Sequence, residues 1–202
     1  MNVVLASGNA GKLEELNAVL APLGVTLRAQ RQLGISDAEE TAITFVENAL
    51  IKARHAAAAG MPAIADDSGL VVPALGGAPG VLSARYAGSP SDAAANNRKL
   101  IAALASVIDR RAYFVCSLVF LRDVADPAPF IATATWNGRI VDRPAGTGGF
   151  GYDPHFLVDG FDQTAAELPA SVKNRISHRG KAAALLVDAI RSALDEKQPT
   201  RS

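Results

Sequence analysis

The chain has little of several features that mark specialised classes of protein. Its 202 residues contain a single cysteine, Cys116, so no disulfide can form within one chain. No apolar run reaches the length of a membrane-spanning helix. The N-terminus lacks the basic segment followed by a long apolar one that marks a signal peptide. We therefore expect a cytoplasmic protein.

Net charge is also missing. Lys plus Arg and Asp plus Glu number 20 each, so no global positive field favours the phosphate backbone of a nucleic acid. We expect neither a nucleic acid nor a membrane as partner, although a local basic pocket for one small anion stays compatible with this balance. The hydrophobic content of 49% is ordinary for a globular protein. We expect one domain over residues 1–202, with a frayed tail at 195–202.

What is present is an alternation of strands and helices. An apolar run at Asn2–Ala6 predicts a buried strand, and leucines at helical spacing from Leu13 to Leu23 predict a helix after it. A second strand is expected at Val25–Ala29. Strand, helix and strand in this order indicate an α/β sheet with helical crossovers.

More elements are expected farther along the chain. Thr44 and Glu47 form the pattern of a capping box, which predicts a helix to about Ala59. The others are a strand over Pro62–Ala65 that ends at an acidic pair, a helix over Asp92–Leu104, a strand over Tyr113–Leu121, a hairpin of Phe130–Trp136 and Arg139–Val141 that turns at Asn137-Gly138, and a last helix over Ala182–Leu194.

The acidic pair Asp66-Asp67, followed by Ser68 and Gly69, is the first candidate site. Carboxylates next to a buried strand are costly unless they are paired or bind a cation. A divalent metal held in this way can orient water for attack on phosphorus. Because side chains alternate along a strand, one acid should face the site and the other a structural partner. A plain turn is the alternative, since Asp, Ser and Gly all favour turns.

A second acidic cluster, Glu39-Glu40, precedes the helix that begins near Thr44. Two acids there could simply favour the positive end of the helix dipole. Beside Asp66-Asp67 they become candidate metal ligands, because Mg²⁺ is typically held by one or two carboxylates together with waters and substrate phosphates.

The glycine loop Ser7–Lys12 lies between the first strand and the first helix. Backbone N–H groups in such a loop can approach phosphate oxygens, and Lys12 adds a full positive charge. The loop is not a Walker motif, because only two residues separate Gly8 from Gly11 and Leu13 replaces the metal-binding hydroxyl. A tight turn with a solvated Lys12 explains the composition equally well.

Two later segments could hold a nucleobase. In Gly148–Pro154, glycines flank Phe150, which would let the ring lie exposed and stack on a flat ligand such as a purine. The alternative is that Phe150 and Tyr152 pack into the core. Lys173 and the run Ser177-His178-Arg179 offer donors for base carbonyls or phosphates. Their alternative is a solvated helix start with a capping serine.

Taken in order, these motifs resemble the inosine triphosphate pyrophosphatase family. Each motif alone is weak, but the ordered set is highly specific and extends over nearly the whole chain. One departure is Ala42, where the family pattern usually has glycine. The matching segments are Ser7–Lys12, Glu39–Thr41, Thr44–Ala49, Ala65–Leu70, Ser83–Tyr86, Gly148–Pro154 and Ser177–Arg179.

The resemblance implies a mixed central sheet flanked by helices, with two lobes around a nucleotide-binding cleft, and a homodimer. It also implies a hydrolase that needs Mg²⁺ and converts ITP, dITP and XTP to the monophosphate and pyrophosphate. Such an enzyme cleans the nucleotide pool and keeps these nucleotides out of DNA and RNA.

The resemblance also assigns roles by position. Glu40 and Asp67 would hold Mg²⁺, Asp67 would activate the attacking water, and Ser68 would contact the substrate. The triphosphate would be bound by Ser7, Gly8, Asn9, Ala10, Gly11 and Lys12. The base would be bound and selected by Phe150, Gly151, Tyr152, Asp153, Lys173, His178 and Arg179.

Two alternatives to this function remain. A Maf-type pyrophosphatase acting on other nucleotides is one, but the Phe150 loop and the His178-Arg179 pair argue against it. A regulator that binds nucleotides without hydrolysing them is the other. Intact Glu40, Asp67 and Lys12 argue against a regulator, because a sensor need not keep a hydrolytic metal site.

Overall fold

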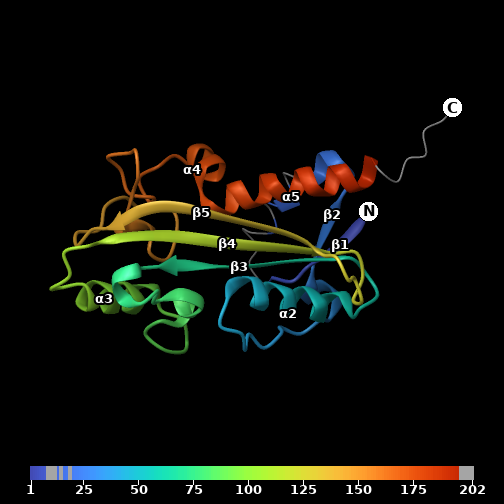
Figure 1. The fold of residues 1–202 in the computed structure, drawn as a ribbon, viewed down its shortest axis with the longest axis horizontal. Helices are drawn as coiled ribbons and strands as arrows, with labels where there is room; N and C mark the ends of the chain where they lie inside the picture. Colours follow the sequence, from blue (N-terminus) through green and yellow to red (C-terminus); the bar gives the residue numbers. More distant parts are fainter. Residues whose placement is uncertain (8–12, 14–15, 18–19, 196–202) are drawn as a thin grey trace. The chain divides into compact units, whose positions relative to one another are not determined.

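The protein is described by a computed structural model, which covers residues 1–7, 13, 16–17 and 20–195. Its strands are β1 (Asn2–Leu5), β2 (Thr26–Ala29), β3 (Ala63–Val71), β4 (Arg111–Leu121), β5 (Phe130–Ile140) and β6 (Phe156–Val158). They form one sheet in the order β2-β1-β3-β4-β5-β6 (Figure 1). β1 is parallel to β2 and β3, whereas β5 is antiparallel to β6. The predicted mixed α/β sheet is confirmed.

The helices begin at residues whose side chains cap them, except the one that begins at Ala170, which has no side-chain cap. They are α2 (Phe45–Ala57), α3 (Ala93–Ala103), α4 (Ala170–Ile176) and α5 (His178–Asp195). The Thr44 hydroxyl accepts a hydrogen bond from the Glu47 N–H at 3.3 Å, as the capping box predicts. Asp92 caps α3 by accepting from two backbone N–H groups. Ser177 accepts from the Gly180 N–H at 3.2 Å at the start of α5.

The predicted helix from Leu13 to Leu23 falls largely outside the described residues. Its described members Leu13, Leu16 and Leu20 are helical. A short 3₁₀ turn, η1 (Ala21–Leu23), follows and is closed by Gly24 at φ 68°. Of the described helices, none has the length and the apolar character that crossing a bilayer requires.

Two sequence predictions are wrong. The strand at Pro62–Ala65 does not end at the acidic pair: β3 continues to Val71. The hairpin turn at Asn137-Gly138 does not exist, because β5 runs straight through both residues. Gly138 is paired with Val158 of β6, and a Cβ on Gly138 would lie 2.3 Å from the Leu157 carbonyl oxygen. This glycine therefore permits a close approach of strands rather than a turn.

The chain divides into two compact units. The first comprises Met1–Asp67, Ser117–Thr133 and the chain from Ala182, and the second comprises Ser68–Cys116 and Ala134–Lys181. The boundary within β3 falls between Asp67 and Ser68. The single-domain assignment stays a prediction.

The core of the first unit is built on small side chains. Ala49, Ala53 and Ala56 of α2 are fully buried and pack against valines and alanines of β1, β3 and β4. Small residues on this face let the helix lie close to the sheet. Within this unit α2 covers one face of the strands and α5, with buried Leu186 and Ile190, covers the other (Figure 1).

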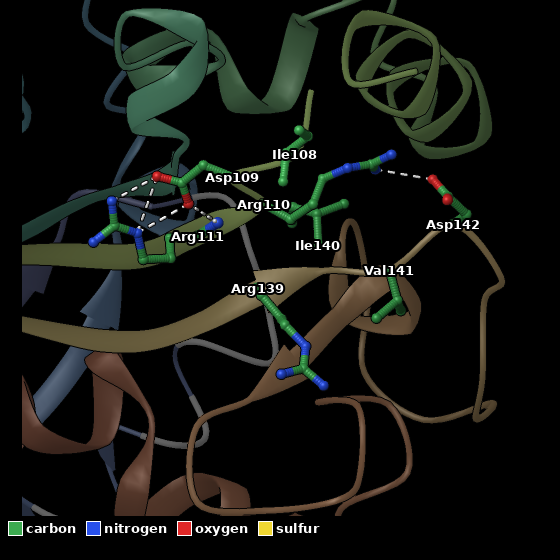
Figure 2. A pocket seen from close by; sticks show the side chains of 8 residues that line it. All are labelled: Ile108, Asp109, Arg110, Arg111, Arg139, Ile140, Val141 and Asp142. Atoms are coloured by element: carbon green, nitrogen blue, oxygen red, sulfur yellow. Dashed lines mark hydrogen bonds and ion pairs between the residues drawn. The ribbon is translucent and has the colours of Figure 1, made fainter. Parts of the chain in front are cut away.

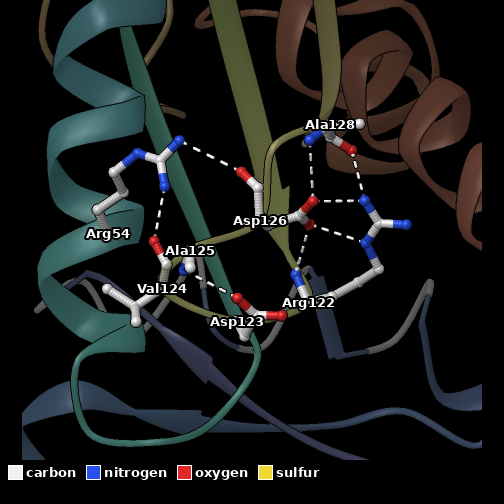
Figure 3. A network of polar contacts seen from close by, with 7 residues as sticks. All are labelled: Arg54, Arg122, Asp123, Val124, Ala125, Asp126 and Ala128. Atoms are coloured by element: carbon white, nitrogen blue, oxygen red, sulfur yellow. Dashed lines mark hydrogen bonds and ion pairs between the residues drawn. The ribbon is translucent and has the colours of Figure 1, made fainter.

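The connection between β4 and β5 is held down by a buried carboxylate in the same unit (Figure 3). Asp126 is buried and accepts hydrogen bonds from the Arg122 Nε at 2.8 Å, the Arg122 N–H at 3.0 Å and the Ala128 N–H at 3.0 Å. Arg54 of α2 donates to the carbonyl oxygens of Val124 at 2.6 Å and Asp126 at 3.3 Å. These bonds fix the connection to α2.

The second unit has an aromatic core. Phe114 of β4 lies 6.3 Å from the Trp136 ring of β5 and 4.7 Å from the Phe156 ring of β6, measured between ring centroids. Leu100 of α3 and Leu104, the residue that caps its C-terminus, are fully buried in the same cluster. This core supports the loop of residues 144–153 described below, through the buried side chain of Tyr152.

Candidate active site

The acidic pair lies in the middle of a buried strand. Asp66 and Asp67 are consecutive residues of β3, so their side chains point to opposite faces of the sheet. The pair is therefore asymmetric, as expected from strand alternation. Asp66 is 2% exposed and Asp67 is 9% exposed. Two carboxylates at this depth need compensation from nearby groups.

Lys52 of α2 compensates Asp67 and joins it to Glu40. The Lys52 ammonium donates to Glu40 Oε1 at 2.7 Å and to Asp67 Oδ1 at 3.2 Å. All three side chains are at most one quarter exposed. We call Glu40, Lys52 and Asp67 the acidic group. It brings together the two residues for which the sequence predicts metal binding.

A buried asparagine holds the loop that carries Glu40. Asn48 of α2 is 1% exposed, and its amide accepts from the Ala42 N–H at 3.0 Å and donates to the Ala42 carbonyl at 3.2 Å. No described residue other than glycine has a positive φ. Ala42 therefore tolerates its side chain without strain, which explains how it can replace the usual glycine.

The electrostatics of the acidic group leave Asp67 short of positive charge. Burial raises the pKa of Asp67 above its ordinary value of 3.8; Lys52 lowers it, whereas Glu40 raises it further. Burial alone would lower the pKa of Lys52, but the surrounding carboxylates, first among them Asp67 and Glu40, outweigh burial and raise it above 10.5. Lys52 therefore stays charged, yet it does not fully neutralise its neighbours.

The donor set fits a hard divalent cation. Asp67 Oδ2 is buried and has no hydrogen-bond partner within the part of the chain that the structure describes. Among those same residues, no three His, Cys, Asp or Glu side chains gather into a cluster that could hold a metal ion by itself. Mg²⁺ needs only one or two carboxylates when waters and phosphate oxygens complete its shell. Glu40 and Asp67 are sufficient for such a site.

The start of the predicted phosphate loop follows β1 at the level at which the neighbouring β3 reaches the acidic pair. Leu5 of β1 pairs with Ile64 of β3 in parallel register. Ser7 lies two residues beyond Leu5, and Asp66 lies two residues beyond Ile64. Ligands of parallel sheets bind beyond the carboxyl ends of strands, and β1 ends here. The other five predicted residues, Gly8, Asn9, Ala10, Gly11 and Lys12, lie outside the described residues.

The second unit contains a separate group around Phe150. The Phe150 side chain is 60% exposed. Lys173 Nζ lies 5.3 Å and Arg179 Cζ lies 5.4 Å from the centroid of its ring. An exposed ring beside two cations is available for stacking, as the glycine-flanked sequence predicts.

Asp153 organises the loop that presents Phe150. Its Oδ2 accepts from the Phe150 N–H at 2.8 Å and from Lys173 Nζ at 2.5 Å. Gly149, at φ 71°, has no room for a side chain, because a Cβ there would lie 2.1 Å from Asp153 Oδ2. The glycine is required by both its backbone conformation and this contact.

Tyr152 and His178, two further predicted base-binding residues, have buried side chains. The Tyr152 hydroxyl donates to the Ser83 carbonyl at 2.8 Å, and burial raises the pKa of Tyr152 above its ordinary value. The His178 ring stacks on Phe114 at 4.9 Å between centroids. The sequence allowed the loop aromatics either to be exposed for stacking or to pack into the core. Phe150 is exposed and Tyr152 is packed into the core, so each alternative applies to one residue. Ser68, in β3, is partly exposed.

Three polar residues with contacts in these groups were missed by the sequence prediction. Lys52 joins the two carboxylates, Asn48 holds the Glu40 loop, and Asn97 of α3 donates to the Gly151 carbonyl at 2.9 Å. One signal was present in the sequence. Asn48 and Lys52 are four residues apart on one face of an otherwise alanine-rich helix, and such polar residues on a buried face need a partner.

A hollow of about 500 Å³ elsewhere in the second unit contains none of the predicted site residues (Figure 2). It is lined by Ile108, Asp109, Arg110, Arg111, Arg139, Ile140, Val141 and Asp142. Arg110 donates to Asp142 at 2.9 Å, and Arg111 pairs with Asp109 through its Nε at 2.9 Å. Two of the three guanidinium groups are thus already neutralised, and Arg139 points away from both pairs (Figure 2). This hollow offers no concentrated positive charge for a phosphate.

The family profile of Ham1 proteins matches residues 3–189. The chain belongs to the Ham1 family. A dITP/XTP pyrophosphatase of Ralstonia nicotianae is 56% identical over 193 residues, which cover 94% of this chain and 96% of that protein. A dITP/XTP pyrophosphatase of Shigella flexneri is 54% identical, covering 94% and 98%.

Solved structures agree with this assignment to the Ham1 family. A HAM1 protein from Coxiella burnetii superposes with a TM-score of 0.92 at 46% identity, covering 95% of this chain and 99% of that one. The Staphylococcus aureus Ham1 protein has a TM-score of 0.88 at 39% identity, covering 96% and 100%. The family inferred from the ordered motifs is confirmed.

Proposed function

We propose that this Ham1 protein hydrolyses ITP, dITP and XTP to the nucleoside monophosphate and pyrophosphate, with Mg²⁺ as cofactor. The observation that carries the proposal is the acidic group, in which a buried Asp67 carboxylate oxygen lacks a donor within the described residues. The relatives named dITP/XTP pyrophosphatases support the choice of substrates.

Glu40 and Asp67 hold the cation in this proposal. Mg²⁺ bound there supplies charge neutralisation for the phosphate oxygens. Asp67 also orients and activates the water that attacks the α-phosphorus. In the metal-free protein, burial raises the pKa of Asp67, so its carboxylate accepts a proton more readily than an exposed one does. Lys52 keeps the two carboxylates together and limits their mutual repulsion.

The chemical step requires positioning and charge neutralisation more than covalent work. The water oxygen forms a bond to the α-phosphorus, and the bond from this phosphorus to the bridging oxygen breaks. Pyrophosphate leaves with the bonding electrons. The Ser7–Lys12 loop holds the triphosphate in line by backbone N–H groups and the charge of Lys12, and Ser68 contacts the substrate.

The Phe150 group binds and selects the base. Hypoxanthine and xanthine carry a carbonyl at position 6, where adenine carries an amino group. Donors such as Lys173 and Arg179 accommodate the carbonyl, whereas with ATP they would face another donor. Phe150 stacks on the ring, and Gly151, Tyr152, Asp153 and His178 complete or support this surface. The exposed Phe150 ring with two adjacent cations supports this role.

We also propose that the enzyme works as a cytoplasmic homodimer that keeps such nucleotides out of DNA and RNA. The dimer and the role in the nucleotide pool follow from the family resemblance. Analytical ultracentrifugation of the purified protein checks the dimer: a sedimentation coefficient of a monomer at micromolar concentration would contradict it.

A pyrophosphate-release assay with ITP, dITP, XTP, GTP and ATP in Mg²⁺ tests the function. We expect rapid release from the first three and slow release from ATP, whose amino group at position 6 faces the donors. Equal rates with ATP and ITP would refute the selectivity. Inosine diphosphate plus phosphate as products would refute the cleavage position. Binding without turnover would indicate the regulator instead.

A further inference from the structure

The loop that presents Phe150 is tethered to α3 by a side chain that has no assigned role. Asn97, in the first half of α3, donates from Nδ2 to the Gly151 carbonyl at 2.9 Å. Gly151 follows Phe150 directly and has φ 61°. The position of this carbonyl therefore constrains the backbone that carries the Phe150 ring.

The rest of the loop turn is internal. The Phe150 N–H donates to Asp153 Oδ2 at 2.8 Å, and the Asp153 N–H donates to the Phe150 carbonyl at 3.2 Å. These bonds close the turn on itself. The bond from Asn97 connects that closed turn to a regular helix whose Leu100 is fully buried in the core. A turn that is closed internally can still move as a body, and the tether restricts this motion.

The neighbouring asparagine shows what is special about Asn97. Asn96 is buried, and its amide accepts from the Ala87 N–H at 2.6 Å and donates to the Ala84 carbonyl at 3.0 Å. Both ends of that amide are used. In Asn97 only the donor is used: Oδ1 is buried and has no hydrogen-bond partner in the described part of the chain.

An unpaired buried acceptor lowers stability. A position selected only for stability would not retain an amide whose oxygen is left without a donor. Alanine is also a better helix former than asparagine. The residue is thus costly for the fold, which is the pattern expected where function constrains the choice.

We propose that Asn97 is a positioning residue for the nucleobase: by fixing the Gly151 carbonyl it fixes the Phe150 ring, and this raises the affinity for the base. The inference rests on the proposed base-binding role of the Phe150 group. Asn97 does not itself touch the nucleotide in this account. It acts through the loop, so its loss weakens binding without removing a catalytic group.

The test compares Asn97→Ala with Arg98→Ala, an exposed neighbour on the same helix. Calorimetric titration with IMP, the product, measures base affinity whether or not the protein hydrolyses ITP. We expect Asn97→Ala to weaken IMP binding about fivefold to tenfold, the effect of one hydrogen bond. Arg98→Ala should leave it unchanged. With ITP as substrate, KM should rise by a similar factor while kcat changes less than about twofold.

Amide hydrogen exchange reads the loop directly, independently of any nucleotide. Exchange at Phe150 and Asp153 should accelerate in Asn97→Ala and not in Arg98→Ala. The midpoint of thermal unfolding should stay constant or rise, because the substitution removes one unsatisfied polar atom along with the satisfied one and introduces a better helix former. Asn97→Asp removes the donor and places a carboxylate against the Gly151 carbonyl, so it should weaken IMP binding more than alanine does.

Unchanged IMP affinity in both Asn97 variants would overturn the proposal, whether or not loop exchange accelerates. A fall in thermal stability with normal affinity would assign Asn97 a purely structural role and overturn it equally. If the wild-type protein binds IMP but releases no pyrophosphate from ITP, the proposed hydrolysis fails while the Asn97 comparison still decides the positioning role.

Discussion

Asp67 and Asp126 are both buried aspartates of the first unit, and their surroundings are opposite. Asp126 accepts hydrogen bonds from the Arg122 side chain and from two backbone N–H groups (Figure 3). Asp67 is bonded at Oδ1 by Lys52, which it shares with Glu40, and Oδ2 has no partner among the described residues. One carboxylate is saturated with donors, and the other is short of them.

The pKa directions express the same difference. Hydrogen bonds from the Arg122 side chain hold the pKa of Asp126 well below its ordinary value. Burial raises the pKa of Asp67. A saturated carboxylate stabilises the fold and has no remaining capacity for a ligand. A carboxylate short of donors costs stability and keeps an oxygen for a cation, which is how a structural and a functional aspartate can be told apart.

The largest expected effect is on turnover. Asp67→Asn should lower kcat for ITP by about 1,000-fold or more, because the substitution removes both a metal ligand and the group that activates water. Asp126→Asn should leave kcat nearly unchanged and lower the midpoint of thermal unfolding instead. Steady-state kinetics with thermal melts of both variants separates the two roles. A similar loss of kcat in both would erase the distinction.

The next largest expected effect is on stability, when the cationic partner of each aspartate is removed. Lys52→Met leaves Glu40 and Asp67 uncompensated and should lower the free energy of unfolding of the metal-free protein by about 3 kcal/mol. Millimolar Mg²⁺ should restore much of this loss, because the cation replaces the ammonium charge. Arg122→Met should also destabilise the protein, but without rescue by Mg²⁺. Urea unfolding with EDTA or Mg²⁺ measures all four states, and equal rescue of both variants would contradict the account.

The smallest expected effect is on how the free energy of unfolding depends on pH. The folded-state pKa of Asp67 lies above 3.8, so its stabilising contribution is fully present below that value and is lost as the pH rises through the folded-state pKa. Asp67→Asn should therefore be more stable than the metal-free wild type at pH 7, and this advantage should disappear toward pH 4.

Asp126 should show the opposite behaviour. Its folded-state pKa lies below 3.8, so its contribution is present above that value and is lost as the pH falls through the folded-state pKa. Asp126→Asn should be less stable than wild type at pH 7, and the deficit should shrink only below about pH 4. Urea unfolding from pH 7 to pH 3 tests both signs, and parallel profiles for the two variants would be evidence of equivalent carboxylates.

Much of the fold follows from the sequence because its signals are local. Hydrophobic runs predicted β1, β2 and β4, and a capping box predicted the start of α2. The predicted turn at Asn137-Gly138 was wrong because glycine is favoured both in a tight turn and where two strands approach closely. Only the packing of β6 against Gly138 distinguishes the two cases. The predicted end of the strand at Asp66-Asp67 was wrong because Asp, Ser and Gly usually favour turns. In this protein they lie inside β3, where pairing with the neighbouring strands outweighs that preference.

The site was predictable from the sequence where a residue type rarely occurs in the observed position without a function, as for carboxylates in a buried strand. Paired acids beside a buried strand pointed to Asp67, and the structure places Glu40 beside it through Lys52. Lys52 and Asn97 were missed because their roles depend on contacts to residues 15 and 54 positions away, respectively. The spacing of Asn48 and Lys52 on an alanine-rich helix indicates that Lys52 needs a partner, but it does not identify that partner, and Asn97 has no comparable signal.

Hydrolysis of ITP in water labelled with ¹⁸O tests the central claim most directly. If Asp67 and its cation direct water to the α-phosphorus, mass spectrometry will find the label in IMP and unlabelled pyrophosphate beside it. Label in the pyrophosphate, or in inorganic phosphate released with inosine diphosphate, would place the attack at another phosphorus and contradict the account.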